Sequence, residues 1–268
     1  MSIQLFKSLW GMEHLSYRES IEQIAAAGYD GVESTLPAPE HTNEFMELLQ
    51  EHQLGFIALI GSSGATVSAH EEVFAAGIER AAAFRPLLAI SHSARDCWSF
   101  EDQFSFFRSA LRAEQAAGVR VGHETHRHRA MYTPWNTAKL LQELPDLRIT
   151  ADFSHWCCVC ETLLEDQGDA LRIAFERTIH IHARVGYAQG PQVPHPAAPE
   201  YAPELQRHEL WWSSILAQRE KQGFTSTTVT PEFGPPGYMH TLPFTRQPVS
   251  DLWDTCLWMG ERMRAKFK

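Results

Sequence analysis

Residues 178–184 read TIHIHAR, a stretch in which polar and apolar side chains alternate. Neighbouring side chains of a β-strand point to opposite faces, so His180, His182 and Arg184 are expected on one face. Ile179 and Ile181 then lie on the other face, where a buried parallel sheet packs against its helices. The stretch therefore predicts a strand of a parallel sheet that carries its polar groups on the inner side.

Three more stretches have the same character: VRVGHE (119–124), LRITADF (147–153) and STTVTPEF (226–233). A polar residue stands near the end of each, namely Glu124, Asp152 and Glu232, and His182 takes this place in TIHIHAR. In a parallel barrel, residues at the same end of neighbouring strands converge on one point. The sequence therefore predicts that these four side chains meet.

Strand-like and helix-like segments alternate along the whole chain. The expected strands are 3–9, 29–34, 54–60, 86–92, 119–124, 147–153, 178–184 and 226–233. Helical patterns lie between and after them, among them one over residues 160–176, and Gly28, Gly55, Gly118 and Gly223 stand where helix ends are expected. Eight such units in 268 residues predict one domain, 1–268, with the fold of an α/β (β/α)8 TIM barrel.

Composition narrows the class of protein. The formal charge of −10 argues against a nucleic-acid partner, because phosphate binding needs clustered Lys and Arg. No apolar run approaches the roughly 18 residues of a membrane span, and the start of the chain does not resemble a signal peptide. Cys157, Cys158 and Cys160 fit neither a disulfide framework nor a paired zinc site. We therefore expect neutral thiols in a cytoplasmic protein that has no membrane partner.

The four converging residues suit one divalent metal ion. A single carboxylate at a strand end usually caps a helix, but several buried carboxylates are costly unless a cation neutralises them. Two Glu, one Asp and one neutral His form an oxygen-rich set of ligands, for which manganese, magnesium or cobalt is the best match and zinc is compatible.

With these residues the chain resembles the xylose isomerase-like TIM-barrel superfamily of sugar isomerases and epimerases, which also includes endonuclease IV. The resemblance rests on Glu124 in GHETH, on Asp152 and His155 in an Asp-x-x-His motif, on His182 in HIHAR and on Glu232 in TPEFGP. In the ketose 3-epimerases of this superfamily the matching Glu, Asp, His and Glu bind the metal. The resemblance implies that Glu124, Asp152, His182 and Glu232 are ligands here, and that Glu124 and Glu232 act as acid and base.

The resemblance implies carbohydrate metabolism: an isomerase or epimerase that removes a proton beside the carbonyl of a keto sugar and passes through an enediolate. His155 is a candidate for orienting a substrate hydroxyl, Arg184 for binding a substrate anion or forming an internal salt bridge, and His126, on the face of Glu124, for a further substrate contact. The epimerases carry an Arg six residues after the metal His, where this chain has Ala188.

Other features of the chain have weaker assignments. Residues 184–203, rich in Pro and Gly, are too long for a simple connection and are expected to form a lid or pocket wall. In the first half, Lys7, Trp10, Glu33 and His92 lie near strand ends, where core packing is the better expectation for each.

Four rival functions compare with this interpretation on the sequence alone, and the residues disfavour all but the first. A dehydratase of a keto-inositol or a hydroxy ring acid begins with the same proton abstraction. Endonuclease IV requires more His and acidic ligands and a basic groove, and the amidohydrolases place H-x-H on the first strand. A non-catalytic sugar-binding barrel would usually have lost a ligand. The expected partner is a small carbohydrate, and a homo-oligomer stays open.

Overall fold

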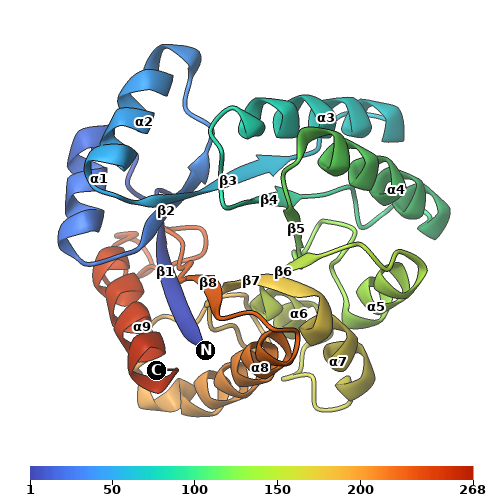
Figure 1. Cartoon of the computed structure of the whole chain (residues 1–268). Coiled ribbons are helices and arrows are strands. Elements are labelled where there is room, and N and C mark those ends of the chain that lie inside the picture. The colour runs from blue at the N-terminus through green and yellow to red at the C-terminus, as the bar shows by residue number, and fades with distance from the viewer. Residues whose placement is uncertain (268) are drawn as a thin grey trace.

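Eight parallel β-strands close into a barrel in the computed structural model, which describes residues 1–267 (Figure 1). The strands follow one another in chain order, and β8 pairs with β1 to close the ring. Their bounds are β1 (Ser2–Ser8), β2 (Gly31–Thr35), β3 (Gly55–Gly61), β4 (Leu88–His92), β5 (Val121–Glu124), β6 (Ile149–Ala151), β7 (Thr178–His182) and β8 (Ser226–Thr230). The predicted single-domain (β/α)8 barrel is confirmed.

Helices surround the barrel on its outer side (Figure 1). They are α1 (Tyr17–Ala26), α2 (Thr42–Glu51), α3 (Val67–Ala82), α4 (Phe100–Ala117), α5 (Pro134–Glu143), α6 (Phe153–Cys160), α7 (Gly168–Arg177), α8 (Ala202–Lys221) and α9 (Leu252–Lys266), with short 3₁₀ turns at Pro39–His41 and Pro199–Tyr201. Ser16 and Glu19 form a capping box at the start of α1. Gly118 ends α4 with a φ of 68°, as a left-handed C-cap should.

The helix predicted over residues 160–176 is wrong in its first half. α6 ends at Cys160, Glu161 follows in a left-handed conformation, and the next helix, α7, begins only at Gly168. α6 begins directly after β6, and the cause is local. The Asp152 side chain accepts a hydrogen bond from the backbone N–H of Ser154 and caps the helix. Asp152 is thus both the residue that follows β6 and the N-cap of α6.

The lower part of the barrel interior is apolar. Phe6, Ile57, Leu88, Ile90 and Ile179 pack together there. The Phe6 ring lies against β2 and β3 at Gly31 and Gly55, where no side chain intervenes. Gly55 is therefore the first residue of β3, where it leaves room for the Phe6 ring. The left-handed residue predicted at Gly55 is instead Gln53, with a φ of 55°.

Ile179 was predicted on the helix-facing side of β7, and this prediction is wrong. The register between β6 and β7 shifts at a bulge: Ile149 pairs with Thr178, but Thr150 pairs with His180. The unpaired Ile179 turns inward and joins the lower layer of the barrel, since a bulge inserts one extra residue into a strand. Ile181 packs in the main sheet–helix core, as predicted.

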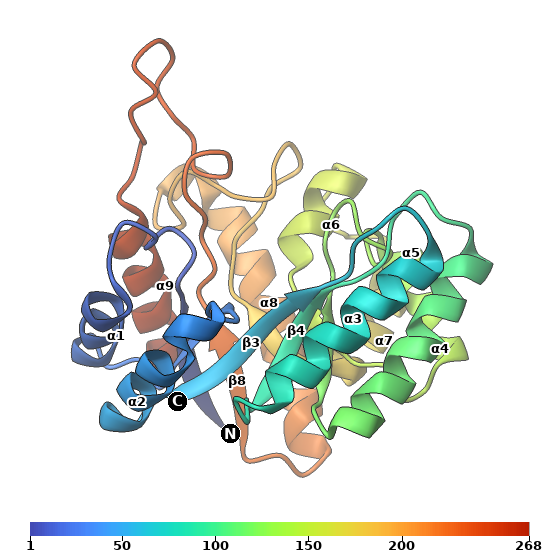
Figure 2. The same cartoon turned by 90° about the horizontal axis from the view of Figure 1, so that it is seen from above.

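Long loops rise above the barrel beyond β7 and β8 (Figure 2). The side chain of Gln192 in the first loop bonds to both backbone groups of Gly234 in the second, at 2.7 and 3.2 Å. At the far tip of the second loop Phe244 is fully exposed. None of the helices in residues 1–267 is long and apolar enough to cross a membrane, and the cytoplasmic location stays a prediction.

The five cysteines are free, as expected. Burial raises the pKa values of the Cys157, Cys158 and Cys160 thiols, which keeps all three neutral at physiological pH.

Candidate metal centre

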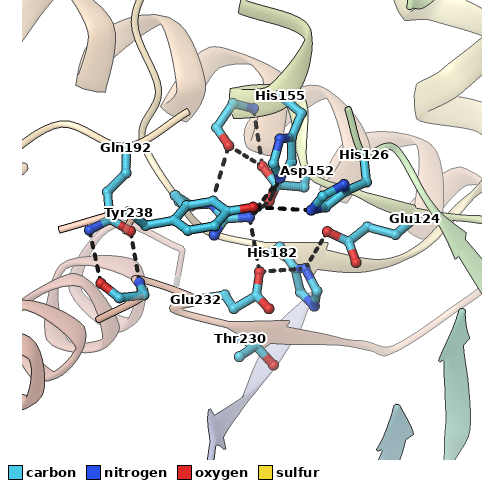
Figure 3. Close-up of polar contacts among 12 residues, drawn as sticks. Glu124, His126, Asp152, His155, His182, Gln192, Thr230, Glu232 and Tyr238 are labelled. Carbon is cyan, nitrogen blue, oxygen red and sulfur yellow. Dashed lines mark hydrogen bonds and ion pairs between the residues drawn. The ribbon is translucent and has the colours of Figure 1, made fainter. Parts of the chain in front are cut away.

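The four polar residues predicted to converge lie together at the carboxyl ends of β5 to β8. Glu124 ends β5, Asp152 follows β6, His182 ends β7 and Glu232 follows β8, and all four are buried. One potential ligand atom from each lies within 4.8 Å of the others. In Figure 3, His182 stands between Glu124 and Glu232. Its Nδ1 is 3.0 Å from Oε2 of Glu232 and 3.5 Å from Oε1 of Glu124.

Arg184 forms ion pairs with two of the carboxylates, those of Asp152 and Glu232. Its guanidinium pairs with Asp152 and lies 3.2 Å from Oε2 of Glu232. It also lies 3.0 Å from Nε2 of His155, and its plane faces the Tyr238 ring at 4.7 Å. Burial raises the pKa of Asp152 to about 6, although Arg184 acts in the opposite direction. The salt-bridge alternative for Arg184 is therefore present in the structure.

Several buried atoms of the cluster have close polar neighbours but none in hydrogen-bond geometry among the described residues: both oxygens of Glu124, Oε2 of Glu232 and both ring nitrogens of His182. Burial alone would lower the pKa of His182, but the surrounding carboxylates raise it well above its usual range. The proton thus held on Nδ1 takes the position that a cation would occupy. Three carboxylates and one imidazole, with unsatisfied atoms on Glu124, Glu232 and His182, fit a divalent ion.

Two residues from the first half of the barrel contact this cluster. Oε1 of Glu33, on β2, lies 3.3 Å from Nε2 of His182, and Nε2 of His92, at the end of β4, lies 2.7 Å from Oε2 of Glu124. Core packing was the better expectation for both. The signal that pointed to them was position: His92 ends β4, and Glu33 lies within β2, two residues before its end.

A cavity of about 830 Å³ opens in front of the cluster. Glu124, Glu232 and His92 line it at one end, whereas Asp152 and His182 lie behind them. Its other walls come from the first half of the chain: Ser8, Leu9, Trp10, Met12, Glu13, Leu15, Ser16, Tyr17, Ser20, Ser34, Thr35, His41, Glu44 and Leu59. The two glutamates are therefore the members of the cluster that a bound molecule would meet.

The predicted substrate residues divide into two groups. His126 and Arg184 line the cavity, but His155 is fully buried behind His126, with ring centroids 3.8 Å apart and the rings tilted by 42°. Tyr238, which the sequence did not reveal, also lines the cavity, and its hydroxyl lies 3.2 Å from Nε2 of His126. It sits in an irregular loop, where no strand or helix period marks a functional side chain.

The loop 184–203 contributes only Arg184 to the main cavity. Residues Tyr187 and Gln189–Gln192 instead line a smaller cavity of about 490 Å³ together with residues 237–241. The loop thus packs against the segment that carries Tyr238. It forms a wall of this second cavity and, apart from Arg184, not of the main one.

The family model described as xylose isomerase-like TIM barrel matches residues 21–232. The chain belongs to this family. A search of curated proteins found no significant match. Members of the family thus share the barrel that carries the acidic cluster described above, and the expected resemblance is confirmed.

Solved structures of known proteins share the fold. D-allulose 3-epimerase from Methylomonas sp., in complex with D-allulose, is 14% identical, with a TM-score of 0.64 over 99% of this chain and 98% of that one. Endonuclease IV from Thermus thermophilus is 16% identical, with a TM-score of 0.60 over 99% and 98%. The probable 3-DHS dehydratase AsbF from Bacillus anthracis is 14% identical, with a TM-score of 0.67 over 99% and 100%. Such different enzymes on one fold mean that function must be argued from the site.

Proposed function

We propose that this protein is a divalent-metal-dependent isomerase or epimerase of a keto sugar or a related polyhydroxy ketone. The observation that carries the proposal is the placement of Glu124 and Glu232. They lie on either side of His182, and both face the 830 Å³ cavity (Figure 3). Two carboxylates so placed can remove a proton from one side of a substrate carbon and return it from the other.

Glu124, Asp152, His182 and Glu232 would hold the metal. When bound, a divalent cation polarises a ketone carbonyl and an adjacent hydroxyl and stabilises the negative charge of the enediolate. Mn²⁺, Mg²⁺ and Co²⁺ suit the three carboxylates best, and Zn²⁺ is compatible.

The chain's own groups prepare the proton transfer. His92 lies against one oxygen of Glu124 and Arg184 against one oxygen of Glu232, so each glutamate is oriented by a different neighbour. Burial lowers the pKa of His126 to about 3, which keeps its imidazole neutral. Its Nδ1 already lies at the Arg127 carbonyl oxygen and its Nε2 at the Tyr238 hydroxyl, so a substrate hydroxyl would bond to Nε2 by replacing Tyr238.

The lining of the cavity favours an uncharged substrate. Among the described lining residues Arg184 is the only Arg or Lys, and it already pairs with Asp152 and Glu232. Glu13 and Glu44 add negative charge on the opposite wall. A phosphorylated sugar or a nucleic-acid backbone would meet an acidic surface here, which supports a neutral carbohydrate as the substrate.

The first experiment measures divalent-metal content and affinity for the wild type and for Glu232→Gln. Glu209→Gln is the matched control, because Glu209 is equally buried but pairs with Arg262 and Lys266 on the outer side. We expect one metal ion per chain in the wild type and the control, and loss or strong weakening in Glu232→Gln. A wild type that takes up none of Mn²⁺, Co²⁺, Mg²⁺ or Zn²⁺ contradicts the proposal.

The second experiment incubates the metal-loaded protein with a panel of keto sugars in D₂O and follows exchange of the proton beside the carbonyl by NMR. Exchange with recovery of an epimer or an isomer supports the proposal, and Glu124→Gln should abolish it. A product that equals the substrate minus one water molecule would make the protein a dehydratase. Sugar binding without exchange would make it a binding protein.

A further inference from the structure

Glu33 is a fully buried carboxylate that the proposed proton transfer does not use. Its Oε1 lies 3.3 Å from Nε2 of His182, and its Oε2 lies 3.4 Å from Nε2 of His180. The Thr230 hydroxyl donates a hydrogen bond of 2.6 Å to the same Oε2. Among the described residues, no Lys or Arg side chain forms an ion pair with Glu33, so its charge is directed at these three groups.

The neighbours of Glu33 can all act as donors. His180 has its other ring nitrogen, Nδ1, 2.8 Å from the Thr228 hydroxyl, which leaves Nε2 to face Glu33. His182 has Nδ1 facing Glu124 and Glu232, which leaves its Nε2 to face Glu33 as well. The Thr230 hydroxyl thus bonds to this carboxylate, and two imidazole nitrogens face it at 3.3 and 3.4 Å without hydrogen-bond geometry. A small rotation of either ring would make it a donor to Glu33.

Glu33, His180 and His182 also lie close enough together to suggest a second ion. Two observations favour protons in this place instead. None of the three residues lines either described cavity, so an ion would have no open position and no route to it. One oxygen of Glu33 already accepts the Thr230 hydroxyl.

We propose that Glu33 is a positioning residue of the metal centre. It accepts the Nε2 proton of His182 and so fixes the ring with Nδ1 as the ligand nitrogen, pointing at Glu124, Asp152 and Glu232. A carboxylate behind a ligand histidine fixes its tautomer and ring plane and raises its basicity. This inference rests on the proposed function, because it needs a metal at Nδ1.

The test is a calorimetric titration of metal-free protein with Mn²⁺, for the wild type, Glu33→Gln and Thr230→Val. A glutamine side chain has one acceptor oxygen and a donor amide, so it cannot receive both imidazole N–H groups. We expect Glu33→Gln to weaken Mn²⁺ binding by about 10- to 100-fold, the usual effect of losing such a partner. Thr230→Val, which removes one donor to Glu33, should weaken it by about two- to tenfold. Glu209→Gln should bind as the wild type does.

A spectroscopic measurement separates positioning from a general loss of structure. In the Co²⁺-loaded wild type, the proton on Nε2 of His182 should give a hyperfine-shifted, exchangeable NMR signal that exchanges slowly, because the nitrogen is buried. In Thr230→Val the visible absorption of Co²⁺ should shift while the melting temperature of the metal-free protein changes little.

The outcomes are distinguishable. If the wild type binds Mn²⁺ and Glu33→Gln binds it equally well, the role of Glu33 is refuted and the proposed function stands. If Glu33→Gln does not fold, the Thr230→Val affinity and the Co²⁺ spectra decide, and an unchanged affinity or the absence of the exchangeable signal refutes the role. If the wild type binds no divalent metal, the proposed function fails and this inference fails with it.

Discussion

Divalent metal should raise the thermal stability of this protein by an amount that the structure lets us estimate. Glu124, Asp152 and Glu232 are buried together, with Arg184, His182 and His92 as their nearest basic neighbours. A cation that binds only the folded chain stabilises it by about 2.7 kcal/mol at a concentration 100 times its Kd. The unfolding entropy, about 2.1 cal/mol/K per residue, amounts to roughly 0.56 kcal/mol/K for 268 residues.

The expected rise in Tm is therefore about 5 °C at 100 times the Kd, and about 7 °C at 1,000 times. Scanning calorimetry of chelator-treated protein, with Mn²⁺ added in steps, measures it. Glu232→Gln should lose most of the rise, whatever its metal-free Tm, and Glu209→Gln should keep it. A rise of equal size in Glu232→Gln would place the bound metal elsewhere and refute the reasoning.

Four further predictions concern pH, the barrel interior and the loops. Metal must displace a proton from His182 at neutral pH and also one from Asp152 below its pKa of about 6. Mn²⁺ affinity should therefore rise with pH, by about a hundredfold per unit below pH 6 and about tenfold per unit above it; a flat profile in titrations from pH 5 to 8 would contradict this. In the metal-free protein the raised pKa of Asp152 should make the free energy of unfolding fall as pH rises from about 4 to about 6. In this range Asp152 is already ionised in the unfolded chain but still protonated in the folded one, and urea unfolding at several pH values measures the difference. Gly31→Ala would place a methyl group onto the Phe6 ring and 2.5 Å from the Gly55 carbonyl oxygen, and should cost about 1–3 kcal/mol of unfolding free energy, whereas Gly168→Ala, which meets open space, should not. Gln192→Ala removes both bonds to Gly234 and should speed amide hydrogen exchange of the Gly234 N–H by about tenfold or more; unchanged protection would show that the loops do not depend on this link.

The sequence predicted the architecture and the meeting of four side chains because both follow from local patterns. Alternation within TIHIHAR placed His180 and His182 on one face, and the spacing of strand ends brought Glu124, Asp152 and Glu232 to the same end of the barrel. A parallel barrel converts such repeated local signals into one place in space.

What the sequence did not predict depends on contacts between distant parts of the chain. Glu33 and His182 lie on β2 and β7, and no local pattern pairs them. Ile179 turned inward because of a register shift against β6, which a single strand does not reveal. Tyr238 reaches the cavity from an irregular loop. Asp152 looked like a strand end alone, but the Ser154 N–H that it caps starts α6 at once.

The candidate centre draws its four ligands from β5 to β8, but its supports, Glu33 and His92, come from β2 and β4. The shorter way around the ring from β2 to β7 runs through the pairing of β8 with β1, the contact that joins the first strand to the last. A C-terminal half barrel, β5 to β8, would carry all four ligands without the carboxylate behind His182. Tight metal binding at this centre would then depend on closure of the whole ring.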